Sequence, residues 1–207
     1  MSSPSIAVDA DAAAPAAAAD VPSAAASALQ HPSAALNQYW YSARTIRAMV
    51  EEVLSLPGPA VFLATPSLFF AVPAAVRAAR GDALLDIDAQ SFDAAQNFHV
   101  FDFRGGAAAL PPALRARFAL AVIDPPFITA DAWELFAEAA GALLAPGGAV
   151  IATSVRENEA LLARLLGLRR TPFLPSIPQL VYQYSTFTRG FEPTVLGRAN
   201  PEIPGED

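Results

Sequence analysis

The sequence has no cysteine and only two histidines, His31 and His99, among its 207 residues. Without cysteine, the chain can form no disulfide framework, no thiolate nucleophile and no cysteine-based zinc site. The two histidines lie far apart and have no partners at the spacing of metal ligands, so a structural or catalytic zinc ion is not expected. We therefore predict no metal cofactor.

Lysine is also absent, since all 13 basic residues are arginine, and 20 acidic residues give the chain a net charge of −7. Phosphate backbones attract Lys and Arg, so an acidic chain is a poor general binder of nucleic acid. A nucleic-acid partner is therefore not favoured, although a local basic patch would still be compatible with this composition.

Long apolar runs are missing as well, and no window is long and apolar enough to predict a membrane span. Residues 1–30 are mostly Ala, Ser and Pro, with three aspartates and no basic residue. A transit peptide would be rich in arginine, and a signal peptide would combine a basic start with an apolar run. We predict a disordered tail over 1–30, no membrane association, and a cytoplasmic location.

The rest of the chain alternates strand and helix patterns. Apolar residues at helical spacing predict a helix from Ala43 to Leu56, with Ser42 as its N-cap. Because the strands are continuous apolar runs, we predict an α/β domain over 36–190 with a doubly wound, mostly parallel sheet, followed by a C-terminal tail over 191–207. The expected strands are 60–64, 83–88, 98–102, 118–124, 149–154, 169–173 and 180–187, and the other helices are 68–80, 131–144 and 157–166.

Several polar residues follow these strands, at the edge where parallel α/β sheets bind ligands. In a nucleotide-binding sheet, Asp88 would accept hydrogen bonds from ribose hydroxyls, and Asp86, which alternates with it, competes for that role. Asp102 could accept from an adenine amino group, or could simply form a turn. The polar residues at the expected strand ends are Thr65, Ser67, Asp88, Asp102 and Asp124.

The most specific motif is Asp124-Pro125-Pro126-Phe127. Each proline fixes its own φ and pushes the preceding residue to extended geometry, which gives a stiff turn with no N–H at two consecutive positions. Its carbonyls and carboxylate can only accept hydrogen bonds, which suits an amino group presenting its lone pair to a methyl donor, and Phe127 adds an aromatic wall. The alternative is an ordinary Pro-Pro loop that ends a strand.

Aromatic residues gather just before the first predicted helix and again near the end of the chain. Tyr39 and Trp40 could form a lid or stacking platform, or a hydrophobic staple that anchors the helix. Tyr182 and Tyr184 alternate on a predicted strand, a pattern more typical of packing than of a site.

The order of the motifs resembles the eukaryotic elongation factor 1-alpha lysine methyltransferase 1 family, formerly described as N6-adenine methyltransferases. The resemblance covers residues 36–187 and includes a Pro-Ser turn where most class I methyltransferases have a glycine-rich one. It rests on Gln-Tyr-Trp-Tyr-Ser (38–42), Ala-Thr-Pro-Ser (64–67), Leu-Leu-Asp-Ile-Asp (84–88), Phe-His-Val-Phe-Asp-Phe (98–103) and Ile-Asp-Pro-Pro-Phe (123–127).

This resemblance implies a seven-strand class I methyltransferase fold, S-adenosylmethionine as methyl donor, and a lysine of elongation factor 1-alpha as acceptor. It makes the segment from Asp124 to Phe127 the catalytic loop and assigns Asp88 to ribose and Asp102 to adenine. The expected protein is a monomer. The remaining cofactor contacts are expected from Tyr39, Trp40, Thr65, Pro66 and Ser67.

Three hypotheses for the function follow: a protein-lysine methyltransferase, an adenine methyltransferase acting on DNA or RNA, and a non-catalytic binding module with the same fold. The pI of about 4.8 favours the first over the second. The intact Asp-Pro-Pro-Phe motif favours either enzyme over the binding module.

Overall fold

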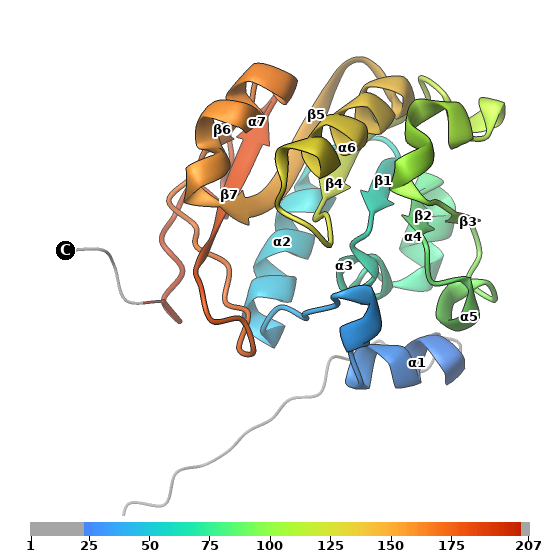
Figure 1. The fold of residues 1–207 in the computed structure, drawn as a ribbon, viewed down its shortest axis with the longest axis horizontal. Helices are drawn as coiled ribbons and strands as arrows, with labels where there is room; N and C mark the ends of the chain where they lie inside the picture. The colour runs from blue at the N-terminus through green and yellow to red at the C-terminus, as the bar shows by residue number, and fades with distance from the viewer. Residues whose placement is uncertain (1–22, 204–207) are drawn as a thin grey trace, which may run out of the picture.

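A computed structural model describes residues 23–203 of the chain. Its centre is a seven-stranded sheet in the order β3-β2-β1-β4-β5-β7-β6 (Figure 1). The first five strands along the chain pair in parallel, whereas β7 is antiparallel to both β5 and β6, so the predicted closing hairpin is present. The strands are β1 (Ala60–Leu63), β2 (Ala83–Asp86), β3 (Phe98–Val100), β4 (Phe118–Ile123), β5 (Leu144–Val155), β6 (Arg169–Arg170) and β7 (Tyr184–Arg189).

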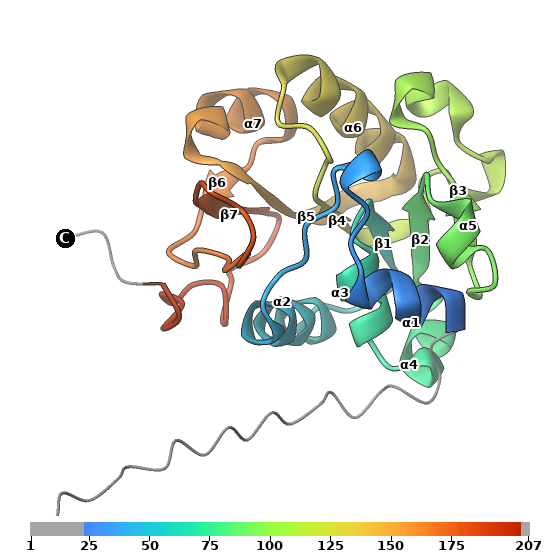
Figure 2. The same ribbon diagram turned by 60° about the horizontal axis from the view of Figure 1, so that its bottom comes forward.

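Helices cover both faces of the sheet, as the continuous apolar strands predict. Figure 2 shows α6 and α7 on one face and α2, α3 and α4 on the other. No helix in residues 23–203 is long and apolar enough to cross a membrane. The helices are α1 (Ser23–Gln30), α2 (Ala43–Ser55), α3 (Pro66–Ala71), α4 (Ala74–Arg80), α5 (Ala89–Phe92), α6 (Ala130–Leu143) and α7 (Glu159–Leu166).

The two-residue periodicity of the strands builds a core on each side of the sheet. In β1, Val61 and Leu63 pack in the cluster that contains Phe136 of α6. Phe62 points the other way and meets Phe69 of α3, with ring centroids 5.5 Å apart. Each fully buried side chain of this kind contributes about 1.5–3 kcal/mol, so both helical layers are firmly attached to the strands.

Two predictions for the first helices have different outcomes in the structure. The Ser42 side chain accepts a hydrogen bond from the Thr45 N–H at 3.1 Å, which confirms the predicted N-cap of α2. The single helix predicted over 68–80 is wrong, because α3 and α4 are separate and Val72 between them is extended. Pro73 causes the break, since proline lacks an N–H and disfavours helical geometry in the residue before it.

The predicted tail over 1–30 is wrong for its last part. Residues 1–22 lie outside the described residues, but Ser23–Gln30 form α1, with Ala25 fully buried. The Trp40 indole N–H donates to the Ala28 carbonyl at 3.3 Å, so α1 is also joined to the segment that precedes α2. Composition failed as a guide here because alanine, although small, fits closely against neighbouring helices.

The predicted C-terminal tail also packs on the domain, as far as the structure describes it. Glu52 of α2 is fully buried, and its carboxylate accepts backbone N–H groups of Thr194 at 3.0 Å, Val195 at 2.7 Å and Leu196 at 2.7 Å. Three charge-assisted hydrogen bonds offset the desolvation of this buried acid. We call residues 191–203 the C-terminal segment.

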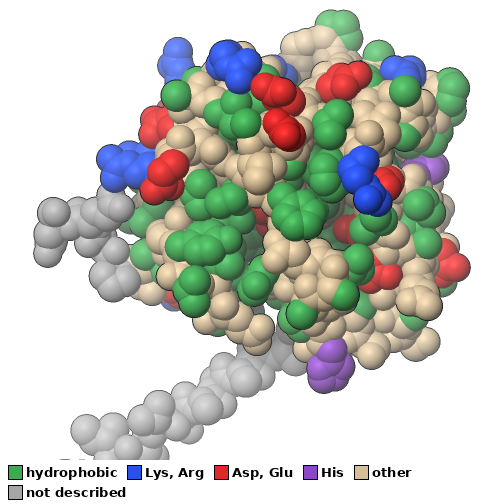
Figure 3. Space-filling model, in the orientation of Figure 1, with side chains coloured by type: hydrophobic (Ala, Val, Ile, Leu, Met, Phe, Trp, Pro, Cys, Tyr) green, Lys and Arg blue, Asp and Glu red, His purple; other side chains and the backbone are tan. Residues whose placement is uncertain are grey.

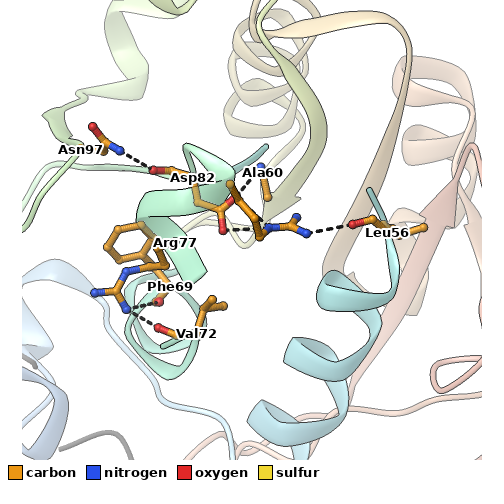
Figure 4. A network of polar contacts seen from close by, with 8 residues as sticks. Leu56, Ala60, Phe69, Val72, Arg77, Asp82 and Asn97 are labelled. Atoms are coloured by element: carbon orange, nitrogen blue, oxygen red, sulfur yellow. Dashed lines mark hydrogen bonds and ion pairs between the residues drawn. The ribbon is translucent and has the colours of Figure 1, made fainter. Parts of the chain in front are cut away.

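A second buried acid ties together the amino ends of the strands (Figure 4). Asp82 accepts the Ala60 N–H at 2.7 Å and the Arg80 Nε–H at 3.2 Å, while its backbone carbonyl accepts from Asn97 at 3.1 Å. Arg80 also donates to the Leu56 carbonyl at 2.9 Å. Burial raises the pKa of Asp82, and the N–H of Ala60 and the charge of Arg80 oppose that rise. This network lies at the end of the sheet opposite to the carboxyl ends of the strands.

Candidate active site

A cavity of about 310 Å³ opens at the carboxyl ends of β1, β2 and β4, beside the point where the strand order reverses between β1 and β4. Open α/β sheets bind their ligands in this place. Figure 3 shows hydrophobic side chains gathered around a hollow in the middle of this face, with charged side chains mostly around it. The main lining segments are 35–41, 64–67, 85–87 and 124–127, together with residues between 101 and 104 and between 177 and 184.

Asp124 follows β4 directly, and its N–H donates to the Leu63 carbonyl of β1 at 3.3 Å. Its half-buried carboxylate accepts a hydrogen bond from the Tyr41 hydroxyl, whose oxygen lies 2.7 Å from the Thr153 Oγ1 of β5. Burial raises the pKa of Asp124 to about 6, and hydrogen bonding, chiefly from Tyr41, works against that rise. The carboxyl is therefore mostly ionised at neutral pH but retains a proton more readily than an exposed aspartate.

The loop that continues from Asp124 is held from two sides. Asn37 donates its side-chain amide to the Pro126 carbonyl and has a left-handed backbone with φ of 53°, which asparagine tolerates. Asn158 donates to the Ile128 carbonyl at 2.7 Å. Phe127 lies at the rim with 51% of its surface exposed. The structure therefore brings all four predicted residues of this motif to the cavity.

The loop after β1 also lines the cavity, through Thr65, Pro66 and Ser67 as predicted. Ala64 begins this loop with a left-handed φ of 53°, and its N–H donates to the Leu85 carbonyl at 2.9 Å. A non-glycine residue in this region is strained, and such strain tends to collect at ligand sites. An alanine here takes the conformation that glycine would allow more easily.

The structure places Asp86, rather than Asp88, at the cavity. Asp86 ends β2, is only 6% exposed, and is oriented by the Asp88 N–H at 2.9 Å. Burial raises its pKa to about 6, and the nearby charge of Asp88 adds to the rise, whereas the backbone N–H opposes it. Asp88 instead caps α5, accepting the Ser91 N–H at 3.1 Å. Asp86 therefore lines the cavity where Asp88 was predicted to, and the contact of either acid with ribose stays a prediction.

Asp102 also lies outside the set of residues that line the cavity. It caps the 3-10 helix Phe103–Ala109 and forms an ion pair with Arg104 at 2.6 Å. Hydrogen bonding from Arg104 lowers the pKa of Asp102. Its neighbours Phe101 and Phe103 line the cavity, so the contact with adenine stays a prediction for this stretch rather than for the carboxylate itself.

Aromatic side chains close the rest of the cavity. Tyr39 and Trp40 line it as predicted, and Tyr182 and Tyr184 join them from the other end of the chain. The rings of Tyr182 and Tyr184 lie 5.9 Å apart, and burial together with the charge of Asp124 raises the pKa of Tyr184. The prediction that this pair serves packing did not anticipate that both residues line the cavity. Their alternation in the sequence was the available signal, although β7 begins only at Tyr184 and Tyr182 precedes it.

Within residues 23–203, no three His, Asp or Glu side chains are grouped so that they could hold a metal ion. The site thus offers two desolvated carboxylates, a rigid proline loop and an aromatic wall.

Residues 32–192 match the sequence profile of a family described as probable N6-adenine methyltransferase. The chain belongs to this family. The matched range contains every segment that lines the cavity. No curated protein matches the sequence.

Solved structures share the fold at low sequence identity. The 1,6-didemethyltoxoflavin-N1-methyltransferase of Burkholderia thailandensis, solved with S-adenosylhomocysteine, is 16% identical, with a TM-score of 0.45 over 70% of this chain and 77% of that one. N-methyltransferase NodS of Bradyrhizobium japonicum, also solved with S-adenosylhomocysteine, is 12% identical, with a TM-score of 0.48 over 70% and 84%. The branched-chain polyamine synthase of Thermus thermophilus, a C9 mutein, is 16% identical, with a TM-score of 0.50 over 74% and 57%. The family match together with the observed strand order, in which only β7 is antiparallel to its neighbours, gives the chain the seven-strand class I methyltransferase fold that the sequence predicts.

Proposed function

We propose that this protein is an S-adenosylmethionine-dependent N-methyltransferase whose acceptor is a lysine amine on another protein. Membership of a methyltransferase family and the class I fold support methyl transfer. The position of the cavity at the switch point supports a nucleoside-containing cofactor. Its volume of about 310 Å³ lies at the lower end of the range typical of small-molecule sites.

The residues present fit S-adenosylmethionine. Asp86 offers a fixed carboxylate for the ribose hydroxyls, while Tyr39, Trp40 and Phe103 offer apolar and aromatic surface for a base. When bound, this cofactor supplies a methyl group carried on a positively charged sulfur. The chain contributes binding, orientation and the exclusion of water, which are the main sources of catalysis in such a transfer.

The observation that carries the assignment to a nitrogen acceptor is the environment of Asp124. Its carboxylate is held by Tyr41 at the end of a buried strand, and two prolines without N–H groups follow it. These groups accept hydrogen bonds from the N–H groups of an amine. They donate none to its nitrogen, so the lone pair stays available. A lysine amine, with a pKa of about 10.4, enters mostly protonated, so the desolvated pocket must favour its neutral form before transfer.

The charge of the site favours a lysine over an adenine in nucleic acid. Of the charged residues that line the cavity, Asp86 and Asp124 are acidic, and Arg104 is paired with Asp102. A net charge of −7 further disfavours phosphate backbones. By resemblance, we propose elongation factor 1-alpha as the partner, with the enzyme a cytoplasmic monomer. The description of the family favours the alternative, an adenine amino group in DNA or RNA.

One experiment separates these acceptors. The full chain is incubated with S-adenosylmethionine labelled in its methyl group and with purified elongation factor 1-alpha, DNA or RNA in parallel. Label should enter the protein as methylated lysine, which cannot arise from self-methylation because the enzyme has no lysine. Asp124→Asn serves as the inactive control. Label only in nucleic acid would establish the adenine alternative, and cofactor binding without transfer to any acceptor would favour the binding module.

A further inference from the structure

Tyr41 lies in the segment before α2 and is almost completely buried, with 5% of its surface exposed. Its place is set by its neighbour Ser42, which caps α2 and donates its backbone N–H to the Ser176 carbonyl at 2.8 Å. The ring packs in the core on the α2 side of the sheet, close to residues such as Met49. Only the hydroxyl reaches the polar side of the cavity, where it meets Asp124 and Thr153.

We propose that Tyr41 is a positioning residue for methyl transfer, whose hydroxyl fixes the Asp124 carboxylate toward the acceptor and holds it in its ionised form. This inference rests on the proposed function of the same site. It adds a residue, 83 positions away from Asp124 in the sequence, that the Asp-Pro-Pro-Phe motif does not contain.

The donor and acceptor inventory gives this contact a direction. An ionised carboxylate has no proton to give, so the Tyr41 hydroxyl donates to Asp124. The Thr153 hydroxyl, 2.7 Å from the Tyr41 oxygen, is then the donor in the second contact. Thr153 is fully buried in β5, so the chain of hydroxyls starts from a rigid strand and ends on the carboxylate. A carboxylate oxygen held in this way cannot rotate away from its orientation without losing a buried hydrogen bond.

The titratable groups around Asp124 come from two elements. Tyr41 lies in the segment before α2 and Tyr184 in β7, while Thr153 on β5 contributes a hydroxyl that does not titrate. Burial raises the pKa of Asp124 to about 6, and the Tyr41 hydrogen bond opposes that rise. Removing the hydroxyl should therefore raise this pKa further. If the ionised form is the active one, the acidic limb of the rate profile should move to higher pH.

Tyr41→Phe tests this inference because it removes the hydroxyl and keeps the ring in the core. Thr186→Val is the matched control, because the Thr186 hydroxyl is buried in the neighbouring strand and has no hydrogen-bond partner among the described residues. Both full-length variants are assayed from pH 5 to 8.5 with labelled S-adenosylmethionine and elongation factor 1-alpha. At pH 6.5, Tyr41→Phe should lower kcat by about tenfold, the effect expected for one lost hydrogen bond to a charged group.

The shape of the profile separates positioning from mere packing. For Tyr41→Phe, the acidic limb should move upward by about one pH unit, the KM for the cofactor should stay within about twofold, and kcat should recover in part at high pH. Thr186→Val should match the wild type throughout. A Tyr41→Phe variant with an unshifted limb would overturn the inference.

A readout without turnover keeps this inference separate from the proposed function. The Asp124 carboxyl is titrated by carbon-13 NMR in the wild type and in Tyr41→Phe, and its pKa should be higher in the variant. If the wild type transfers no methyl group to any acceptor, the proposed function fails, and the NMR titration still decides whether Tyr41 controls the ionisation of Asp124. Equal pKa values in both proteins would contradict the role of Tyr41 whatever the activity.

Discussion

At the scale of single residues, Asp86 is the acid whose environment best fits contact with the cofactor. Asp86→Asn should weaken binding of S-adenosylmethionine by about 1.5–3 kcal/mol, the contribution typical of a hydrogen bond to a charged group, as measured by calorimetry. Asp88→Asn is the matched control, because asparagine caps a helix about as well as aspartate and Asp88 caps α5, outside the set of residues that line the cavity. If only Asp88→Asn weakened binding, the contact with ribose would be assigned to Asp88 instead of Asp86.

Asp86→Asn should also change how the free energy of unfolding depends on pH. Burial raises the pKa of Asp86 in the folded protein to about 6, above its value in the unfolded chain. The stabilisation from the protonated form is complete below the unfolded pKa and is lost as the pH rises through about 6. The free energy of unfolding of Asp86→Asn, relative to that of the wild type, should therefore increase by about 1–3 kcal/mol from pH 4 to pH 8. Urea unfolding at both values measures this difference, and an equal difference at the two would contradict it.

Local signals predicted the residues of the strand ends but not the contacts between them. Asp124 to Phe127 and Thr65 to Ser67 reach the cavity because apolar runs locate the carboxyl ends of β4 and β1. The Tyr41 contact with Asp124 spans 83 positions and depends on how the segment before α2 folds across the sheet. No local pattern contains that information. The choice between Asp86 and Asp88 likewise depended on where β2 ends and α5 begins.

At the scale of secondary-structure elements, Asp82 joins the amino ends of three strands. Asp82→Ala should lower the free energy of unfolding by about 3–5 kcal/mol, because it leaves the Ala60 N–H without its acceptor and the largely buried Arg80 without its negative partner. Urea unfolding measures the loss. Asp82→Asn, which keeps one acceptor oxygen, should lose less. Both variants should bind the cofactor normally, since the cavity lies at the opposite end of the strands.

A loss below about 1 kcal/mol in Asp82→Ala would show that water replaces the carboxylate. Such a result would also mean that the network in Figure 4 adds little to the order of the strands.

Most elements could be predicted because apolar periodicity and proline act locally. The observed strand bounds differ from the predicted ones where pairing between strands decides which residues join the sheet. β5 begins at Leu144, before the Pro-Gly-Gly turn, because Leu144 still pairs with Phe118 across a register shift in β4. β6 is only two residues long and β7 starts at Tyr184, since three prolines between them limit the N–H groups available for pairing.

At the scale of the whole molecule, α1 belongs to the domain. Deleting residues 1–31 should lower the melting temperature by about 2–4 °C for each kcal/mol of packing lost. It should also weaken cofactor binding, because the Ala28 carbonyl that holds the Trp40 indole would be missing. Scanning calorimetry and a binding titration measure the two effects.

A chain that begins at Ser23 is the control for this deletion and should behave as the full chain does. If the chain starting at residue 32 kept the melting temperature and affinity of the full chain, α1 would contribute nothing measurable to the stability of the domain or to its cavity.

The hydrogen bonds from the backbone of residues 194–196 to Glu52 form a clamp, and this clamp affects which substitutions the sequence can tolerate during evolution. Glu52 binds the backbone N–H groups of residues 194–196, so it places no demand on the side chains of Val195 and Leu196 through these bonds. Substitutions at Val195 can accumulate without breaking the clamp, except for proline, which has no N–H to donate. The Leu196 side chain is fully buried in the core on the α2 side, so packing still constrains it. The match to the family profile ends at residue 192, while the fold of this chain continues through the clamp. Relatives that share this attachment should keep an acid at position 52 and an apolar residue at position 196, and should vary more widely at position 195.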